Sequence, residues 1–155
     1  MSISVPIKRL GYRAAFRVLQ LFWLVRRPAA NGVKCVVTEG DRILLVRHTY
    51  GNRRWDFPGG AMKRGEQPLV AAQREMREEL GITSADWSKL GEVRKNVNHR
   101  RDTVHCFRAE LSSPRVRINP AELSTAEWFD RDQLPGTLAP YVAPVLDHFP
   151  QTPAG

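Results

Sequence analysis

Cysteine is scarce in this chain. Its 155 residues include two, Cys35 and Cys106, and each stands in a strand-like run, VKCVV or VHCF. Two thiols cannot hold together a disulfide-dependent fold, so the sequence excludes a disulfide-rich secreted scaffold. We interpret both cysteines as small core residues in a reducing compartment, which predicts a cytoplasmic protein.

Acidic residues are absent from the first 30 positions, which carry six basic ones. The rest of the chain holds 18 basic and 16 acidic side chains. The net charge of +8 therefore belongs mostly to an N-terminal arm, and the body is nearly neutral. A body without a strong positive field gives no reason to expect a specific nucleic-acid partner.

A long uninterrupted apolar run is also missing. Residues 8–27 read KRLGYRAAFRVLQLFWLVRR, with basic or polar residues every three or four positions. This pattern predicts an amphipathic helix with a wide apolar face, too short and too charged to span a bilayer. Arg26 and Arg27 stand where a signal peptide would need small residues. Four alternatives stay open: packing on its own domain, pairing in a homodimer, peripheral contact with an anionic membrane, or targeting.

The predicted organisation is an arm over residues 1–30, one globular domain over residues 31–150 and a frayed tail over residues 151–155. The strand-like and helical segments of the domain are typical of a sheet covered by helices, in the α/β class. Predicted strands cover residues 33–38, 42–47, 90–97, 103–111, 115–118 and 126–129, and predicted helices cover residues 68–80 and 138–149.

The predicted helix at residues 68–80 carries three carboxylates. Glu75, Glu78 and Glu79 stand at i, i+3 and i+4, which predicts one acidic face opposite an apolar stripe. Like charges at this spacing repel one another, and a cation removes the penalty. All-oxygen ligands favour Mg²⁺ first and Mn²⁺ second. The apolar stripe is formed by Leu69, Ala72, Met76 and Leu80.

Glycines and charged residues lie just before this helix, in the run from Pro58 to Glu66 (PGGAMKRGE). Glycine lets the backbone approach a ligand closely and can turn a carbonyl toward a metal. A helix N-terminus with basic neighbours favours an anion such as phosphate. The combination predicts a metal–diphosphate site, although a bare REMREE segment by itself is typical of a solvated helix face.

The segment Gly60–Ile82 reads GAMKRGEQPLVAAQREMREELGI. It resembles the Nudix box, G-x5-E-x7-R-E-U-x-E-E-x-G-U with U apolar, at every fixed position. The preceding WDFPG and the later AEWFDRDQLP extend the similarity over about residues 32–149. The chain is therefore similar to the Nudix hydrolase family, and the arm lies outside the resemblance.

The resemblance implies an α/β/α sandwich with a mixed sheet, and a Mg²⁺-dependent hydrolase that cleaves a nucleoside diphosphate linked to another group. Glu75, Glu78 and Glu79 match the metal-binding glutamates, and the Gly60 carbonyl matches a frequent backbone ligand. Because the general base varies within the family, the base would be Glu79, Glu75 or a glutamate on a later loop, here Glu122.

Two further box residues match supporting positions of the family. Arg74 matches the arginine that orients a glutamate, and Glu66 matches the loop glutamate that supports the metal site. Outside the box, arginine forks suit substrate phosphates, with solubility as the alternative role. The candidates are Arg47, Arg54 and Arg101, and Tyr50, Trp55 and Phe107 are candidates to stack on a base. The four histidines have no ligand spacing and are given no role.

The substrate is left open by the sequence. The downstream proline typical of ADP-ribose hydrolases is missing, since Val97 and Asn98 stand in its place. The tyrosine typical of dinucleoside polyphosphate hydrolases is missing at His99 and Arg100. These absences count against those two substrate classes, and a nucleoside triphosphate or an NDP-sugar or NDP-alcohol remains open. The alternatives are a catalytically silent nucleotide sensor and a membrane-peripheral hydrolase of a lipid-linked diphosphate.

Overall fold

A mixed six-stranded sheet forms the centre of the computed structural model, which describes residues 11–19, 29–51, 53–97 and 99–149. Its strand order is β4-β5-β1-β2-β6, with β3 paired to β1. β1 and β5 run parallel, whereas the other pairs are antiparallel. The strands are β1 (Ala29–Glu39), β2 (Arg42–His48), β3 (Gly59–Ala61), β4 (Asp86–Val97), β5 (Arg100–Glu110) and β6 (Leu123–Asp130).

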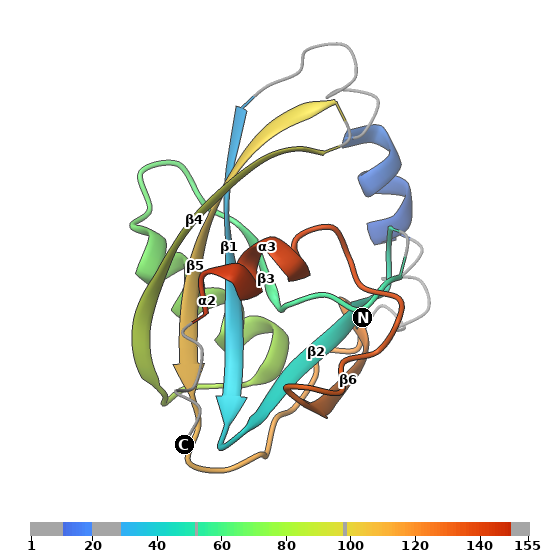
Figure 1. Ribbon diagram of the computed structural model, residues 1–155. Helices are drawn as coiled ribbons and strands as arrows, with labels where there is room; N and C mark the ends of the chain where they lie inside the picture. Colours follow the sequence, from blue (N-terminus) through green and yellow to red (C-terminus); the bar gives the residue numbers. More distant parts are fainter. Residues whose placement is uncertain (1–10, 20–28, 52, 98, 150–155) are drawn as a thin grey trace.

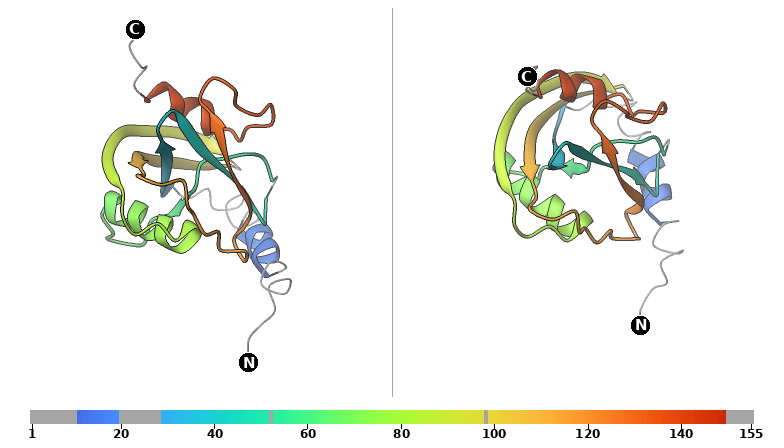
Figure 2. Two further views of the ribbon diagram at one scale, coloured as in Figure 1. Left: turned by 90° about the horizontal axis from the view of Figure 1, so that it is seen from below. Right: turned by 60° about the horizontal axis from the view of Figure 1, so that its bottom comes forward.

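Helices cover both faces of the sheet (Figures 1 and 2). Helix α2 (Pro68–Leu80) lies on one face and helix α3 (Val142–Asp147) on the other. Each helix packs on its own apolar cluster. Successive side chains of β1 point to opposite faces of the sheet, so the residues of β1 are divided between the two clusters. Cys35 accordingly packs on the α2 side and Cys106 on the α3 side, both as buried free thiols. The expected α/β/α sandwich is confirmed.

Helix α2 is rotated relative to the sequence prediction. Pro68 occupies its first turn and Gly81 ends it in the left-handed conformation, as the pattern predicts. The predicted stripe is wrong at Leu69, which is exposed. Glu75 and Glu79 lie on the buried side of α2, so the expectation of three carboxylates opposite the core is also wrong. The buried side consists of Ala71, Ala72, Glu75, Met76, Glu79 and Leu80.

Two other predicted elements differ from the structure. Residues 115–118 are not a strand: the Arg117 and Asn119 amides donate to the carbonyls of Leu80 and Glu79, which a helix end leaves without partners. The predicted helix over residues 138–149 shrinks to α3. The segment before it pairs instead with Trp55, whose carbonyl accepts from the Ala139 amide.

The arm contributes a helix at residues 11–19, drawn in blue beside the loop that follows β2 (Figure 1). Its Tyr12 hydroxyl donates to Glu122, and its Phe16 ring packs near Tyr50. The helix therefore contacts its own domain. The rest of the predicted segment, residues 8–10 and 20–27, lies outside the described residues. Within the described residues no helix is long and apolar enough to cross a membrane.

Candidate functional site

Two glycines bring the backbone against the buried glutamates of α2. The Gly59 amide donates to Glu79 Oε2 at 3.1 Å, and Glu79 is only 2% exposed. Gly59 has φ 152° and lies against Val33, and a Cβ there would approach the Val33 carbonyl oxygen to 2.0 Å. A Cβ on Gly60 would lie 2.7 Å from the Glu75 carboxylate. Gly59 therefore requires glycine, because the backbone of Val33 cannot move away, whereas a side chain at position 60 would displace the Glu75 carboxylate.

Arg74 holds three carboxylates at once. Its Nε and Nη2 donate to the two oxygens of Glu66 at 2.8 and 3.0 Å, a bidentate pair. Its Nη1 donates to Glu75 at 2.8 Å and to Glu78 at 3.3 Å. Arg74 lies on the first turns of α2 and Glu66 on the preceding loop, so this guanidinium ties the loop to the helix.

Negative charge at this site exceeds the positive charge that the chain supplies. Burial, followed by the charge of Glu75, raises the pKa of Glu79 well above its usual value. Burial also raises the pKa of Glu75, against the opposing hydrogen bond from Arg74. By contrast, the hydrogen bonds from Arg74 and from the Lys63 amide lower the pKa of the half-buried Glu66 to about 2. The two buried carboxylates are therefore the ones whose charged forms the site disfavours.

Glu122 reaches the same site from the chain preceding β6. Its backbone carbonyl accepts from the Thr49 amide at 2.9 Å, and its Oε1 accepts from the Tyr12 hydroxyl at 3.2 Å. Its charge contributes to the raised pKa values of Glu75 and Glu79. The later-loop glutamate singled out in the sequence therefore lies near the glutamates of α2.

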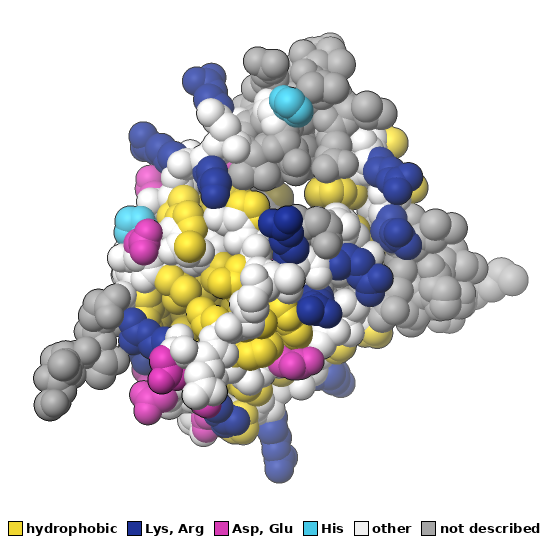
Figure 3. Space-filling model, turned by 45° about the vertical axis from the view of Figure 1, so that its right-hand side comes forward, with side chains coloured by type: hydrophobic (Ala, Val, Ile, Leu, Met, Phe, Trp, Pro, Cys, Tyr) yellow, Lys and Arg dark blue, Asp and Glu magenta, His cyan; other side chains and the backbone are white. Residues whose placement is uncertain are grey.

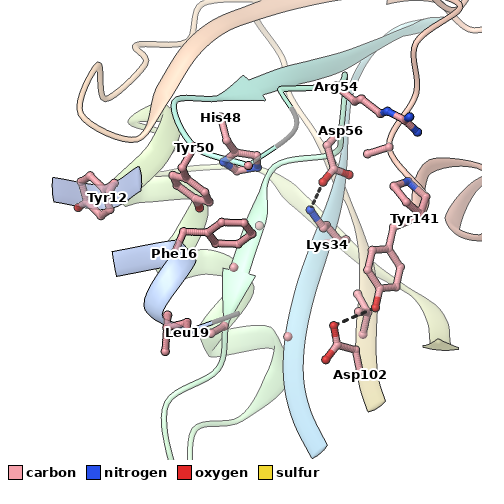
Figure 4. Close-up of a pocket in the computed structure, with 18 of the residues that line it drawn as sticks. Tyr12, Phe16, Leu19, Lys34, His48, Tyr50, Arg54, Asp56, Asp102 and Tyr141 are labelled. Carbon is pink, nitrogen blue, oxygen red and sulfur yellow. Dashed lines mark hydrogen bonds and ion pairs between the residues drawn. The ribbon is translucent and has the colours of Figure 1, made fainter. Parts of the chain in front are cut away.

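A pocket of about 710 Å³ opens beside these glycines (Figure 4). Gly59 and Gly60 line it, together with an ion pair in which Lys34 Nζ donates to Asp56. At another part of the wall the Tyr141 hydroxyl donates to Asp102. Four arginines are also among the lining residues, and basic side chains gather on the face drawn in Figure 3. These arginines are Arg13, Arg17, Arg53 and Arg54.

The predicted substrate-binding residues are dispersed. Arg54 lines the pocket, whereas the Arg47 guanidinium lies 4.3 Å from the centre of the Trp55 ring and Arg101 is exposed on β5. Of the three aromatic candidates, Tyr50 lines the pocket. Trp55 and Phe107 are buried in the two apolar clusters.

Several residues that line the pocket are not predicted by the sequence. Lys34, Asp102 and Tyr141 stand singly on strands or at a helix end, and no motif marks them, whereas Asp56 stands in the WDFPG run, whose resemblance assigns this aspartate no role. His48 was given no role, yet it also lines the pocket. The alternation of β1 does place Lys34 among apolar neighbours, which is a signal that could have identified it.

The box glutamates do not form a closed ligand cluster. Among the residues that the structure describes, no group of three His, Cys, Asp or Glu side chains converges closely enough to hold an ion. Glu75 and Glu78 instead turn to Arg74. A metal at this site would require these two side chains to share their oxygens with it or to leave Arg74.

Comparison with known proteins identifies the family. Residues 27–149 match the profile of the NUDIX domain. The chain is 32% identical over 92 residues to an ADP-ribose pyrophosphatase of Mycobacterium tuberculosis, an alignment covering 56% of this chain and 44% of that protein. It is 30% identical over 129 residues to an RNA pyrophosphohydrolase of Rhizobium meliloti, covering 68% of this chain and 77% of the relative.

A solved structure supports the same family assignment. The MutT NUDIX hydrolase from Burkholderia pseudomallei superimposes with a TM-score of 0.71 at 25% identity, covering 79% of this chain and 98% of the other. The chain spans less than half the length of the Mycobacterium relative. The match of the profile, the sheet and the box geometry together show that the chain belongs to the NUDIX domain family.

Proposed function

We propose that the chain is a Mg²⁺-dependent pyrophosphohydrolase that cleaves a nucleoside diphosphate linked to another group. The observation that carries this proposal is the pair of buried carboxylates, Glu75 and Glu79, held against the backbone of Gly59 and Gly60 beside a pocket. The names of the relatives, an ADP-ribose pyrophosphatase and an RNA pyrophosphohydrolase, support the same bond type without agreeing on one substrate.

The residues present fit a hard divalent cation. Glu75, Glu78, Glu79 and the Gly60 carbonyl would hold it, since all are oxygen donors. Burial raises the pKa of Glu75 and of Glu79, and a bound cation would offset this by stabilising their charged forms. Mn²⁺ suits the same donors. When bound, the ion would lower the pKa of an attacking water and neutralise charge on the phosphoryl oxygens.

The chain's own residues would orient the acidic groups of the site and take up the proton of the attacking water. Arg74 holds Glu66 and Glu75 in fixed positions, which sets the geometry of the acidic site. A carboxylate oxygen that is not committed to the metal can accept the proton of the attacking water, so the candidate bases are Glu79 and Glu75, with Glu122 as the alternative on the later loop. Arg54, on the wall of the pocket, would bind a substrate phosphate.

A hydrolysis screen with Mg²⁺ tests this function directly. The panel would contain nucleoside triphosphates, NDP-sugars, CDP-alcohols, dinucleoside polyphosphates, ADP-ribose and a 5′-triphosphorylated RNA, with products identified by mass. We expect cleavage between two phosphorus atoms that stops when the metal is chelated. No cleavage of any compound, with Mg²⁺ binding intact, would sink the proposal and favour the silent nucleotide sensor.

Replacing Arg74 by lysine should lower turnover by roughly 10- to 100-fold. A lysine ammonium cannot reproduce the forked contacts to Glu66 and Glu75, so the carboxylates would lose their fixed positions. Steady-state kinetics and Mn²⁺ affinity would measure the effect. Arg77→Lys is the matched control, because Arg77 is an exposed residue of the same helix. Equal losses in both variants would count against the orienting role of Arg74.

A further inference from the structure

The helix at residues 11–19 lies outside the part of the chain that matches the family, which begins at residue 27. It nevertheless supplies one wall of the pocket that Gly59 and Gly60 line from the other side. Figure 4 shows Tyr12, Phe16 and Leu19 facing the pocket from this helix. A segment outside the shared domain therefore borders the site that the box residues occupy.

Aromatic rings gather where this helix meets the domain. Tyr50 is at the centre of the group: its ring centroid lies 5.4 Å from that of Phe16, 5.1 Å from that of His48 and 6.1 Å from that of Tyr12. All four residues line the pocket. Such a wall is suited to receive a flat ring by stacking, because the aromatic surfaces are already in place.

One polar atom beside this wall lacks a partner. In the described part of the chain, the buried Nδ1 of His48 makes no hydrogen bond. Burial, followed by the charge of Lys34, lowers the pKa of His48 to about 4, so its ring is neutral near pH 7. A neutral imidazole nitrogen can donate or accept one hydrogen bond, and leaving it unsatisfied is costly. This nitrogen is enclosed by the surrounding side chains and does not face the pocket, so the surface that a ligand meets here is aromatic.

We propose that the helix at residues 11–19 completes the substrate site and that this wall binds the nucleobase, with its ring against Phe16 and Tyr50. The pocket volume of about 710 Å³ lies in the range of small-molecule sites, roughly 300–1,000 Å³, and is ample for a nucleotide. The inference rests on the proposed function for its choice of a nucleotide as ligand. The lining arginines Arg13 and Arg17 would add positive charge from the same helix.

Calorimetric binding to the full-length protein tests the wall separately from catalysis. The probes are AMP, GMP, CMP and UMP, with ribose 5-phosphate as the probe that lacks a base. Phe16→Ala should weaken the preferred monophosphate roughly tenfold and leave ribose 5-phosphate unchanged, and Phe16→Trp should restore binding. Val18→Ala is the matched control, because Val18 is a 65% exposed residue of the same helix that does not line the pocket.

A second variant tests the other ring of the wall. Tyr50→Leu should also weaken the preferred monophosphate and leave ribose 5-phosphate unchanged, because it removes the aromatic surface beside Phe16. Circular dichroism would confirm that both variants fold. The inference is overturned if Phe16→Ala weakens both probes equally or neither, if Tyr50→Leu leaves binding of the monophosphate unchanged, or if the parent binds no monophosphate better than ribose 5-phosphate. Base-dependent binding without any hydrolysis would instead overturn the proposed function alone.

Discussion

Replacing Glu79 by glutamine should lower turnover by at least a thousandfold, on the order of what loss of a metal-site or general-base carboxylate costs. Glutamine keeps the shape of the side chain, and its amide oxygen can still accept the Gly59 hydrogen bond. The charge, which the metal and the attacking water both need, is lost. Single-turnover kinetics with Mg²⁺, together with calorimetric Mn²⁺ binding, would measure the effect.

The same variant should not unfold the protein. Burial raises the pKa of Glu79, so the folded state takes up a proton more readily than the unfolded state. Without metal, this carboxylate therefore lowers stability as pH rises toward and through its raised pKa. Glu79→Gln should remove that loss, so its unfolding midpoint at neutral pH should equal or exceed that of the parent.

Two control variants complete this experiment. Glu127→Gln changes an exposed carboxylate on β6 and should leave turnover unchanged. Glu122→Gln separates the roles: a large loss of turnover with unchanged Mn²⁺ affinity would point to Glu122 as the base. Near-normal turnover in Glu79→Gln would refute the role of Glu79 in both metal binding and proton transfer.

Replacing Gly59 by alanine should destabilise the protein by about 3 kcal/mol or more, through overpacking and backbone strain. The new Cβ would meet the Val33 carbonyl at 2.0 Å, and that oxygen belongs to the paired backbone of β1 and cannot rotate away. For a chain of this size we expect the melting temperature to fall by roughly 10 °C.

The control is Gly136→Ala. A Cβ at Gly136 meets no atom within 4 Å, and its φ lies outside the left-handed region, so its melting temperature should stay near that of the parent. Thermal unfolding followed by circular dichroism would compare the three proteins. A Gly59→Ala protein as stable as the parent would show that β3 can move away from β1 at little cost.

Sequence periodicity located α2 and the strand cores well, because burial on one side imposes a local period. The periodicity failed where a residue's contacts are remote in the sequence. Residues 115–118 have strand-like composition, but the amides of Arg117 and of the following Asn119 bond to carbonyls at the end of α2. Leu69 has the spacing of a core residue and is exposed. In both cases the neighbouring element, and not the local pattern, sets the outcome.

The amino-acid sequence by itself determined the family and the chemistry of the donor atoms. The box is a short segment, and its fixed spacing sets which side chains share a turn of the helix. Only the tertiary structure decided which of these carboxylates are buried, because that depends on how α2 is rotated against the sheet. It alone brought Tyr12 to Glu122, which are 110 positions apart, and His48 to the pocket wall. Contacts at such separation follow from the path of the whole chain, which no local pattern encodes.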